Sequence, residues 1–112
     1  MNDKYERQMK KGVLDMLVLK LLESEAKYGY QIIQEMKEKS GEVFCLKDGT
    51  LYPVLYRLED EGMIISKWSA AEGKQVSRKY YEITDIGRNG LIEIENVWNS
   101  ISRGITMIME EK

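Results

Sequence analysis

The segment between residues 13 and 22 is apolar on almost every side. At about 100° per residue, its eight apolar side chains cover nearly the whole circumference of a helix, and only Asp15 and Lys20 interrupt them. A helix that is apolar all round is buried all round. The chain has 112 residues, one domain by the usual prior of about 100–200 residues, and one such domain cannot surround this helix. The sequence therefore predicts that its own domain covers one side and a second subunit covers the other.

Composition excludes several classes of function. Without histidine, the chain cannot carry Ser-His-Asp or Cys-His catalysis or a Cys2His2 zinc site. It also lacks a glycine-rich phosphate loop and any metal-ligand spacing, so we expect neither an enzyme nor a bound metal or cofactor. The single cysteine, Cys45, cannot form an intrachain disulfide.

No segment is suited to a membrane. The longest uncharged run covers residues 49–56, far below the roughly 20 residues that span a bilayer. The first residues contain no apolar stretch long enough for a signal peptide. We therefore expect a soluble, cytoplasmic protein without a membrane partner.

Three helices come first. The almost wholly apolar segment lies in a helix predicted over residues 6–22, and apolar residues spaced as on one helix face predict helices over residues 28–39 and 50–61. Thr50 or Asp48 is expected to cap the start of the third helix, because a short side-chain oxygen can accept a hydrogen bond from a free backbone amide there.

The period of the pattern changes after residue 62. β-branched and aromatic residues predict two strands over residues 63–69 and 76–83, joined by a loop that contains one glycine. Thr84 and Asp85 then begin a last long helix, with a hydroxyl cap and an acidic residue at the positive end of the helix dipole.

This order of elements defines the expected fold. Two short helices joined by a loop and followed by a hairpin form a winged helix-turn-helix pattern. We expect a mainly α protein with a small antiparallel β-hairpin, folded as a single domain over residues 1–112. The winged helix-turn-helix covers about 6–83, and a C-terminal dimerisation helix covers about 84–110.

An apolar seam runs along the predicted last helix. Its six apolar residues are spaced 3, 4, 3, 4 and 3 apart, as in a coiled coil: Leu91, Ile94, Trp98, Ile101, Ile105 and Ile108. The seam could pack against the chain's own domain. We favour a homodimer, because the helix near the N-terminus independently requires a second partner. The residues expected to form its interface are Val13, Leu17, Leu91, Ile101 and Ile108.

The predicted fold suggests a DNA partner. A winged helix-turn-helix places its third helix in the major groove of DNA. There, tyrosines offer hydroxyls and flat faces, and Arg57 can contact guanine with two hydrogen bonds. A basic hairpin suits the DNA backbone or the minor groove. The residues expected to contact a double-stranded DNA operator are Thr50, Tyr52, Tyr56, Arg57, Lys74, Arg78 and Lys79.

The net charge of −2 and the pI of about 5.3 argue against this partner, because domains that bind nucleic acid tend to be basic. The distribution of the charges weakens this objection. Residues 1–20 carry a net charge of +2 and residues 80–112 carry −3, so the acidic groups lie away from the expected DNA face. The alternative is a winged-helix module that binds another protein, without specific DNA binding.

Three stretches carry a resemblance to a known family. They are residues 28–32 (YGYQI), 49–62 (GTLYPVLYRLEDEG) and 78–87 (RKYYEITDIG). In these stretches the chain resembles the PadR family of bacterial transcriptional regulators, in its short subtype. It departs from the usual pattern at Tyr56, where a basic residue is common. The resemblance implies a dimeric repressor of detoxification or drug-efflux genes that pairs through its first and last helices.

The resemblance also implies a ligand. In a subgroup of the family, a tryptophan from each last helix stacks on planar drugs in a flat hydrophobic pore at the dimer centre, and Trp98 falls at a matching position. Two facing indoles can enclose a flat aromatic or cationic molecule. A planar aromatic or phenolic effector would thus be bound by Met16, Ile94, Trp98 and Ile105. On the other reading, Trp98 only fills the dimer core.

Four further residues receive structural interpretations. Cys45 lies in an apolar run and is expected to be a small core residue. Trp68 is expected to pack the hairpin onto the core. Tyr80 and Tyr81 are expected to pack within the hairpin rather than to stack on bases.

Overall fold

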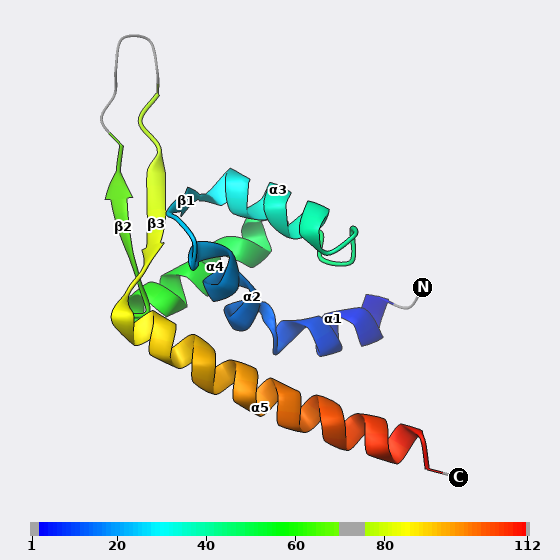
Figure 1. Ribbon diagram of the computed structural model, residues 1–112. Helices are drawn as coiled ribbons and strands as arrows, with labels where there is room; N and C mark the ends of the chain where they lie inside the picture. The colour runs from blue at the N-terminus through cyan, green and yellow to red at the C-terminus, as the bar shows by residue number, and fades with distance from the viewer. Residues whose placement is uncertain (1–2, 70–75, 112) are drawn as a thin grey trace.

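The computed structural model describes residues 3–69 and 76–111. It is mainly helical, with a small antiparallel sheet, as the sequence predicts (Figure 1). In chain order the elements are α1 (Asp3–Lys11), α2 (Leu14–Leu22), β1 (Lys27–Tyr28), α3 (Gly29–Lys39), α4 (Asp48–Asp60), β2 (Ile64–Trp68), β3 (Lys79–Ile83) and α5 (Asp85–Met109).

The first predicted helix is in fact two helices. The single helix expected over residues 6–22 is wrong, because α1 ends at Lys11 and α2 begins at Leu14. Gly12 lies at the break, where it costs helix stability. Val13 follows with φ −110° and ψ −3° and has no side-chain cap bond at the start of α2. The break allows α1 to leave the direction of α2 (Figure 1).

The predicted hairpin is present and gains a third strand. Strands β2 and β3 pair antiparallel from Ile64 opposite Ile83 to Trp68 opposite Lys79. The two-residue strand β1 pairs with the other edge of β3, so the strand order is β1-β3-β2. Strand β3 begins at Lys79, three residues later than predicted. The predicted loop, with Lys74, lies outside the described residues.

The start of α4 also differs from the prediction. The helix begins at Asp48, its N-cap residue is Lys47, and no side chain caps it, so the caps expected from Thr50 or Asp48 are absent. The cap predicted for α5 is confirmed, because Thr84 Oγ1 accepts a hydrogen bond of 3.1 Å from the Gly87 amide. The same hydroxyl donates to the Gly62 carbonyl at 2.6 Å and so joins the end of α4 to the start of α5.

The core lies between α2, α3, α4 and the inner face of the sheet. Val18, Leu19 and Leu55 are fully buried at its centre. Leu91 of α5 is also part of this core, with only 1% of its surface exposed. The expectation that Leu91 contacts a second subunit is therefore wrong, since the chain's own domain covers it.

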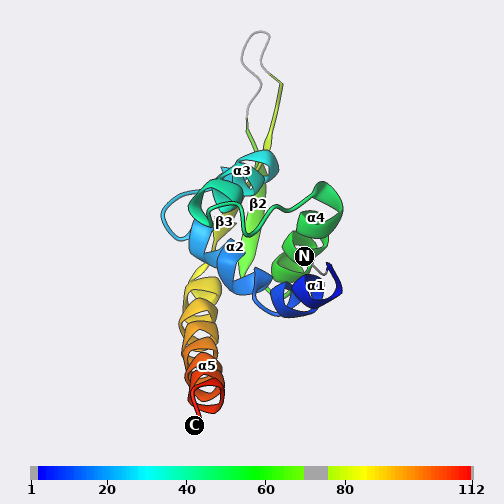
Figure 2. The same ribbon diagram turned by 90° about the vertical axis from the view of Figure 1, so that its right-hand side faces the viewer.

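Helix α5 extends far beyond this core (Figures 1 and 2). It contains 25 residues, and the molecule measures 64 × 33 × 21 Å. Beyond Leu91 its large apolar side chains are mostly exposed, including Val97, Trp98, Ile101, Ile105, Met107, Ile108 and Met109. Within the described residues, no helix is long and apolar enough to cross a membrane.

Candidate nucleic-acid interface and apolar groove

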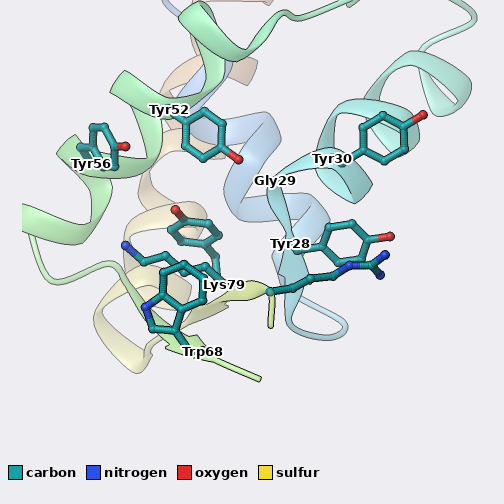
Figure 3. Close-up of a pocket in the computed structure, with 9 residues that line it drawn as sticks. Tyr28, Gly29, Tyr30, Tyr52, Tyr56, Trp68 and Lys79 are labelled. Carbon is teal, nitrogen blue, oxygen red and sulfur yellow. The ribbon is translucent and has the colours of Figure 1, made fainter. Parts of the chain in front are cut away.

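An aromatic cleft of about 630 Å³ lies between α4, the hairpin and the start of α3 (Figure 3). Six of the nine residues that line it are aromatic, and two others are basic. The lining residues are Tyr28, Gly29, Tyr30, Tyr52, Tyr56, Trp68, Arg78, Lys79 and Tyr81. We call this space the aromatic cleft.

Gly29 and Tyr52 fix the back of the aromatic cleft. A Cβ atom at position 29 would overlap the Tyr52 hydroxyl and lie 2.9 Å from Tyr52 Cζ, so this tyrosine can lie against α3 only because residue 29 is glycine. The ring of Tyr56, one turn further along α4, is 6.1 Å from that of Tyr52. Figure 3 shows the Tyr52 hydroxyl directed toward Gly29. Helix α4 therefore presents two tyrosines to the cleft.

Two cations of the aromatic cleft rest on aromatic rings. The Arg78 guanidinium lies 4.5 Å from the centre of the Tyr28 ring, and Lys79 Nζ lies 5.8 Å from that of Tyr81. Neither forms an ion pair with any carboxylate of residues 3–69 and 76–111. The rings orient these cations without neutralising their charge.

Arg57 behaves differently from these two cations. Its guanidinium donates a hydrogen bond to the carboxylate of Asp15 and forms an ion pair with it, which joins α4 to α2. Both side chains remain partly exposed. Arg57 therefore lies on α4 as predicted, but its charge is matched by a carboxylate within the chain.

Tyr81 lies beneath the aromatic cleft, in strand β3. It is fully buried, and burial raises the pKa of its hydroxyl to about 12, with smaller contributions from Tyr52, Tyr56 and Glu59. This hydroxyl is therefore protonated at neutral pH. Tyr81 packs as the sequence predicts.

A charged cluster holds β1 against α3. Lys27 is buried and its ammonium lies 3.3 Å from carboxylate oxygens of both Glu25 and Glu35. Burial acts to raise the pKa of Glu35, but hydrogen bonds from Lys39 and Lys27 outweigh it, and the pKa is lowered. Because β1 contains Tyr28 and is followed directly by Gly29, this cluster positions one wall of the aromatic cleft.

The remaining predicted residues are placed as follows. Thr50 is exposed in the first turn of α4. Tyr52, Tyr56, Arg78 and Lys79 line the aromatic cleft together. Lys74 lies outside the described residues.

The sequence interpretation missed part of the aromatic cleft. Trp68 does not pack the hairpin onto the core, because 68% of its surface is exposed at the cleft. Strand alternation places Trp68 on the same face as the buried Ile64, so the sequence pattern favoured the core, and only the structure shows Trp68 exposed opposite Lys79. Tyr28 and Tyr30 were likewise not singled out. Cys45 is exposed and not a core residue.

An apolar groove of about 650 Å³ lies between the α1–α2 break and α5. It contains all four residues that the resemblance assigned to an effector: Met16, Ile94, Trp98 and Ile105. Met9, Gly12, Val13, Glu93, Val97 and Ile101 complete its lining. We call this space the apolar groove.

The predicted interface residues fall into two sets. Val13 and Leu17 are half-buried against the core, whereas Ile101 and Ile108 are exposed on α5 at 56% and 71% of their surface. Among the described residues, no group of three His, Cys, Asp or Glu side chains lies close enough to hold a metal ion.

Helices α3 and α4, the hairpin and the basic aromatic cleft beside α4 together define a winged-helix protein of the DNA-binding class. Comparison with known proteins agrees with this assignment to the winged-helix class. Residues 18–93 match the transcriptional regulator PadR-like family. The chain belongs to this family, whose members are DNA-binding regulators and not enzymes.

Individual relatives cover most of the chain. An uncharacterized protein of Lysinibacillus sphaericus is 35% identical over 89% of this chain and 91% of its own. The negative transcriptional regulator PadR of Bacillus subtilis is 34% identical over 70% of this chain and 43% of its own. The crystal structure of a PadR family transcriptional regulator from Eggerthella lenta is 33% identical, with a TM-score of 0.82 over 94% of this chain and 88% of that one.

Proposed function

We propose that this chain is a dimeric, sequence-specific repressor that reads an operator with α4 and the hairpin. The observation that carries the proposal is the aromatic cleft, where Arg78 and Lys79 have no carboxylate partner among the described residues although the chain as a whole carries a net charge of −2. Unmatched cations beside a helix that can enter the major groove are suited to the anionic backbone of DNA.

Helix α4 supports base recognition. Its exposed side chains include Thr50 and Tyr56, both able to donate and accept hydrogen bonds. The N-terminus of α4 ends without a side-chain cap, so its free amides can bind a phosphate. Few basic groups are involved, and we therefore expect a modest dependence of affinity on salt.

Binding to the DNA upstream of the chain's own gene tests this function. Fluorescence anisotropy compares that duplex with a scrambled duplex of equal length across a salt series. A preference for the upstream duplex that persists near physiological salt supports the proposal. Equal and weak binding to both, lost as salt rises, contradicts it and favours the winged-helix module that binds another protein.

We further propose that a planar aromatic or phenolic ligand binds the apolar groove and relieves repression of detoxification or drug-efflux genes. Trp98 is 44% exposed there and is flanked by apolar side chains from α2 and α5. An indole face in such a setting binds flat aromatic rings by stacking.

Ligand binding in the apolar groove can be tested by fluorescence, because Trp98 lies in this groove and Trp68 lies in the aromatic cleft. In a Trp68→Phe background, emission reports on Trp98 alone. We expect planar dyes to quench it and to lower affinity for the operator. Trp98→Ala should abolish dye binding while the DNA face stays intact. If dyes bind equally well to Trp98→Ala, the ligand role of the apolar groove is wrong.

A further inference from the structure

One carboxylate lies in the wall of the apolar groove. Of the ten residues that line this groove, Glu93 is the only charged one. It is exposed, and no basic side chain in the part of the chain that the structure describes forms an ion pair with it. A molecule that enters the apolar groove therefore meets a negative charge without a described partner.

Glu93 and Trp98 lie on the same stretch of α5. Five residues separate them, which corresponds to about 7.5 Å along the helix axis. This spacing is comparable with the length of a fused three-ring molecule. Trp98 is 44% exposed, so its indole can stack on a flat ring, and an indole face also attracts positive charge. The indole and the carboxylate thus favour the same kind of ligand, a flat ring system that is positively charged.

We propose that the apolar groove selects planar organic cations, with Trp98 stacking on the ring system and Glu93 pairing with its positive charge. Met16 supplies a flexible apolar contact from α2. This assignment rests on the proposed function, because it requires the apolar groove to bind a ligand. It also narrows the ligand class, since Glu93 attracts a protonated aromatic amine and repels the carboxylate of a phenolic acid.

The charges on the other side of Trp98 do not offset Glu93. A smaller hollow of about 190 Å³ lies there, and its lining includes Trp98, Lys20 and Glu95. The ammonium of Lys20 is 2.9 Å from the carboxylate of Glu23, which matches its charge. Glu95 adds a further carboxylate. The surroundings of the Trp98 indole are therefore negative on balance, which favours a cation.

Three ligands that share one ring system but differ in charge test this preference. Near neutral pH, proflavine is a planar cation, acridine is uncharged and acridine carboxylate is an anion. Binding is measured by the quenching of Trp98 emission in the Trp68→Phe background. DNA is left out, because planar cations also insert between base pairs. We expect proflavine to bind most tightly and acridine carboxylate most weakly.

The variant Glu93→Gln keeps the size of the side chain and removes its charge. We expect it to weaken proflavine about fivefold, as for the loss of a partly exposed ion pair. Binding of acridine should not change, which shows that the apolar groove is intact, and binding of acridine carboxylate should become tighter. Glu95→Gln is the matched control, because it makes the same change two positions further along α5, in the lining of the smaller hollow. We expect its effect on all three ligands to be smaller.

The outcomes separate this inference from the proposed function. If Glu93→Gln leaves the three affinities as they are in the wild type, or if Glu95→Gln changes them equally, Glu93 does not select the ligand. The apolar groove then still binds flat rings, provided that they quench Trp98. If none of the three quenches Trp98, the inference fails together with the proposed ligand role. Operator binding is measured without any ligand and is unaffected by either result.

Discussion

At the scale of single residues, the basic groups of the proposed DNA face differ in their partners. Arg57 was the natural candidate for base contact, yet its guanidinium is paired with Asp15 on α2. Among the described residues, the only partner of Lys79 is the aromatic ring of Tyr81. A pair with both members partly exposed contributes little to stability, roughly 0–1 kcal/mol. Its main consequence is therefore the availability of Arg57 for DNA.

The substitution Asp15→Asn distinguishes the effect of the ion pair on DNA binding by Arg57 from its effect on the stability of the fold. We expect the variant to release Arg57, to raise affinity for a random duplex several-fold and to steepen the salt slope by up to about 0.9 for each subunit bound. Its free energy of unfolding should change by less than about 1 kcal/mol. Anisotropy and urea unfolding measure the two quantities.

The double variant Asp15→Asn/Arg57→Gln provides the control, because it should return the affinity and the slope to wild-type values or below. If Asp15→Asn weakens DNA binding as much as Arg57→Gln does, release of Arg57 is not the effect of the substitution. The ion pair would then act by fixing α4 against α2.

The sequence could not reveal this pair. Asp15 and Arg57 are 42 positions apart, and nothing in the local pattern of either helix joins them. Strand alternation predicted that Trp68 shares a face with the buried Ile64, but not that Trp68 would be exposed there beside Lys79. Local periodicity thus predicts which face a residue occupies, whereas its partner depends on how the elements pack.

At the scale of elements, long periodic segments were predicted and short ones were not. Helices α3, α4 and α5 and the hairpin agree with the sequence to within a few residues. The two-residue β1 is too short to show alternation, and its pairing with β3 depends on a contact distant in sequence. The α1–α2 break at Gly12 was missed because a single glycine inside an expected helix was not taken as a boundary, although Lys10 and Lys11 already interrupt the apolar pattern before it.

The central strand of the sheet provides a pH-dependent readout. The pKa of Tyr81 is about 12 in the folded chain, above its ordinary value of 10.0, and burial is the main cause. Between these values the unfolded chain has lost a proton that the folded chain retains. The contribution of Tyr81 to stability is therefore complete below pH 10 and is lost as the pH rises toward 12.

The ultraviolet absorbance of phenolate measures the titration of the Tyr81 hydroxyl directly. We expect a component with a midpoint near pH 12 that is missing from Tyr81→Phe. The fall in stability from about pH 10 to pH 12 should be smaller in that variant. A wild-type titration that Tyr81→Phe does not alter at its alkaline end would contradict the burial of this hydroxyl.

At the scale of the whole molecule, the long exposed part of α5 is the dominant feature (Figure 2). The heptad spacing predicted which of its residues share a seam, and four of them, Ile94, Trp98, Ile101 and Ile105, line one groove. It could not predict where the chain's own core ends along the helix. That boundary falls just after Leu91, which is buried, so the seam available to a partner begins further along α5.

If a second copy covers this seam, a charge within it should separate the subunits. Burial of one isoleucine side chain contributes about 1.5–3 kcal/mol, and a symmetric interface contains each residue twice. We therefore expect Ile101→Glu to yield a monomer, measured by light scattering across a dilution series. The monomer should retain its helical content and lose affinity for the operator, because one half-site contact is removed.

Ile92→Glu is the matched control. Ile92 is exposed on α5 to nearly the same extent as Ile101, at 60% against 56%. At about 100° per residue, their separation of nine positions places Ile92 on the opposite side of the helix. We expect Ile92→Glu to remain dimeric, since its charge points away from the partner. If both variants dissociate, the interface surrounds α5, and if neither does, the subunits do not pair through this seam.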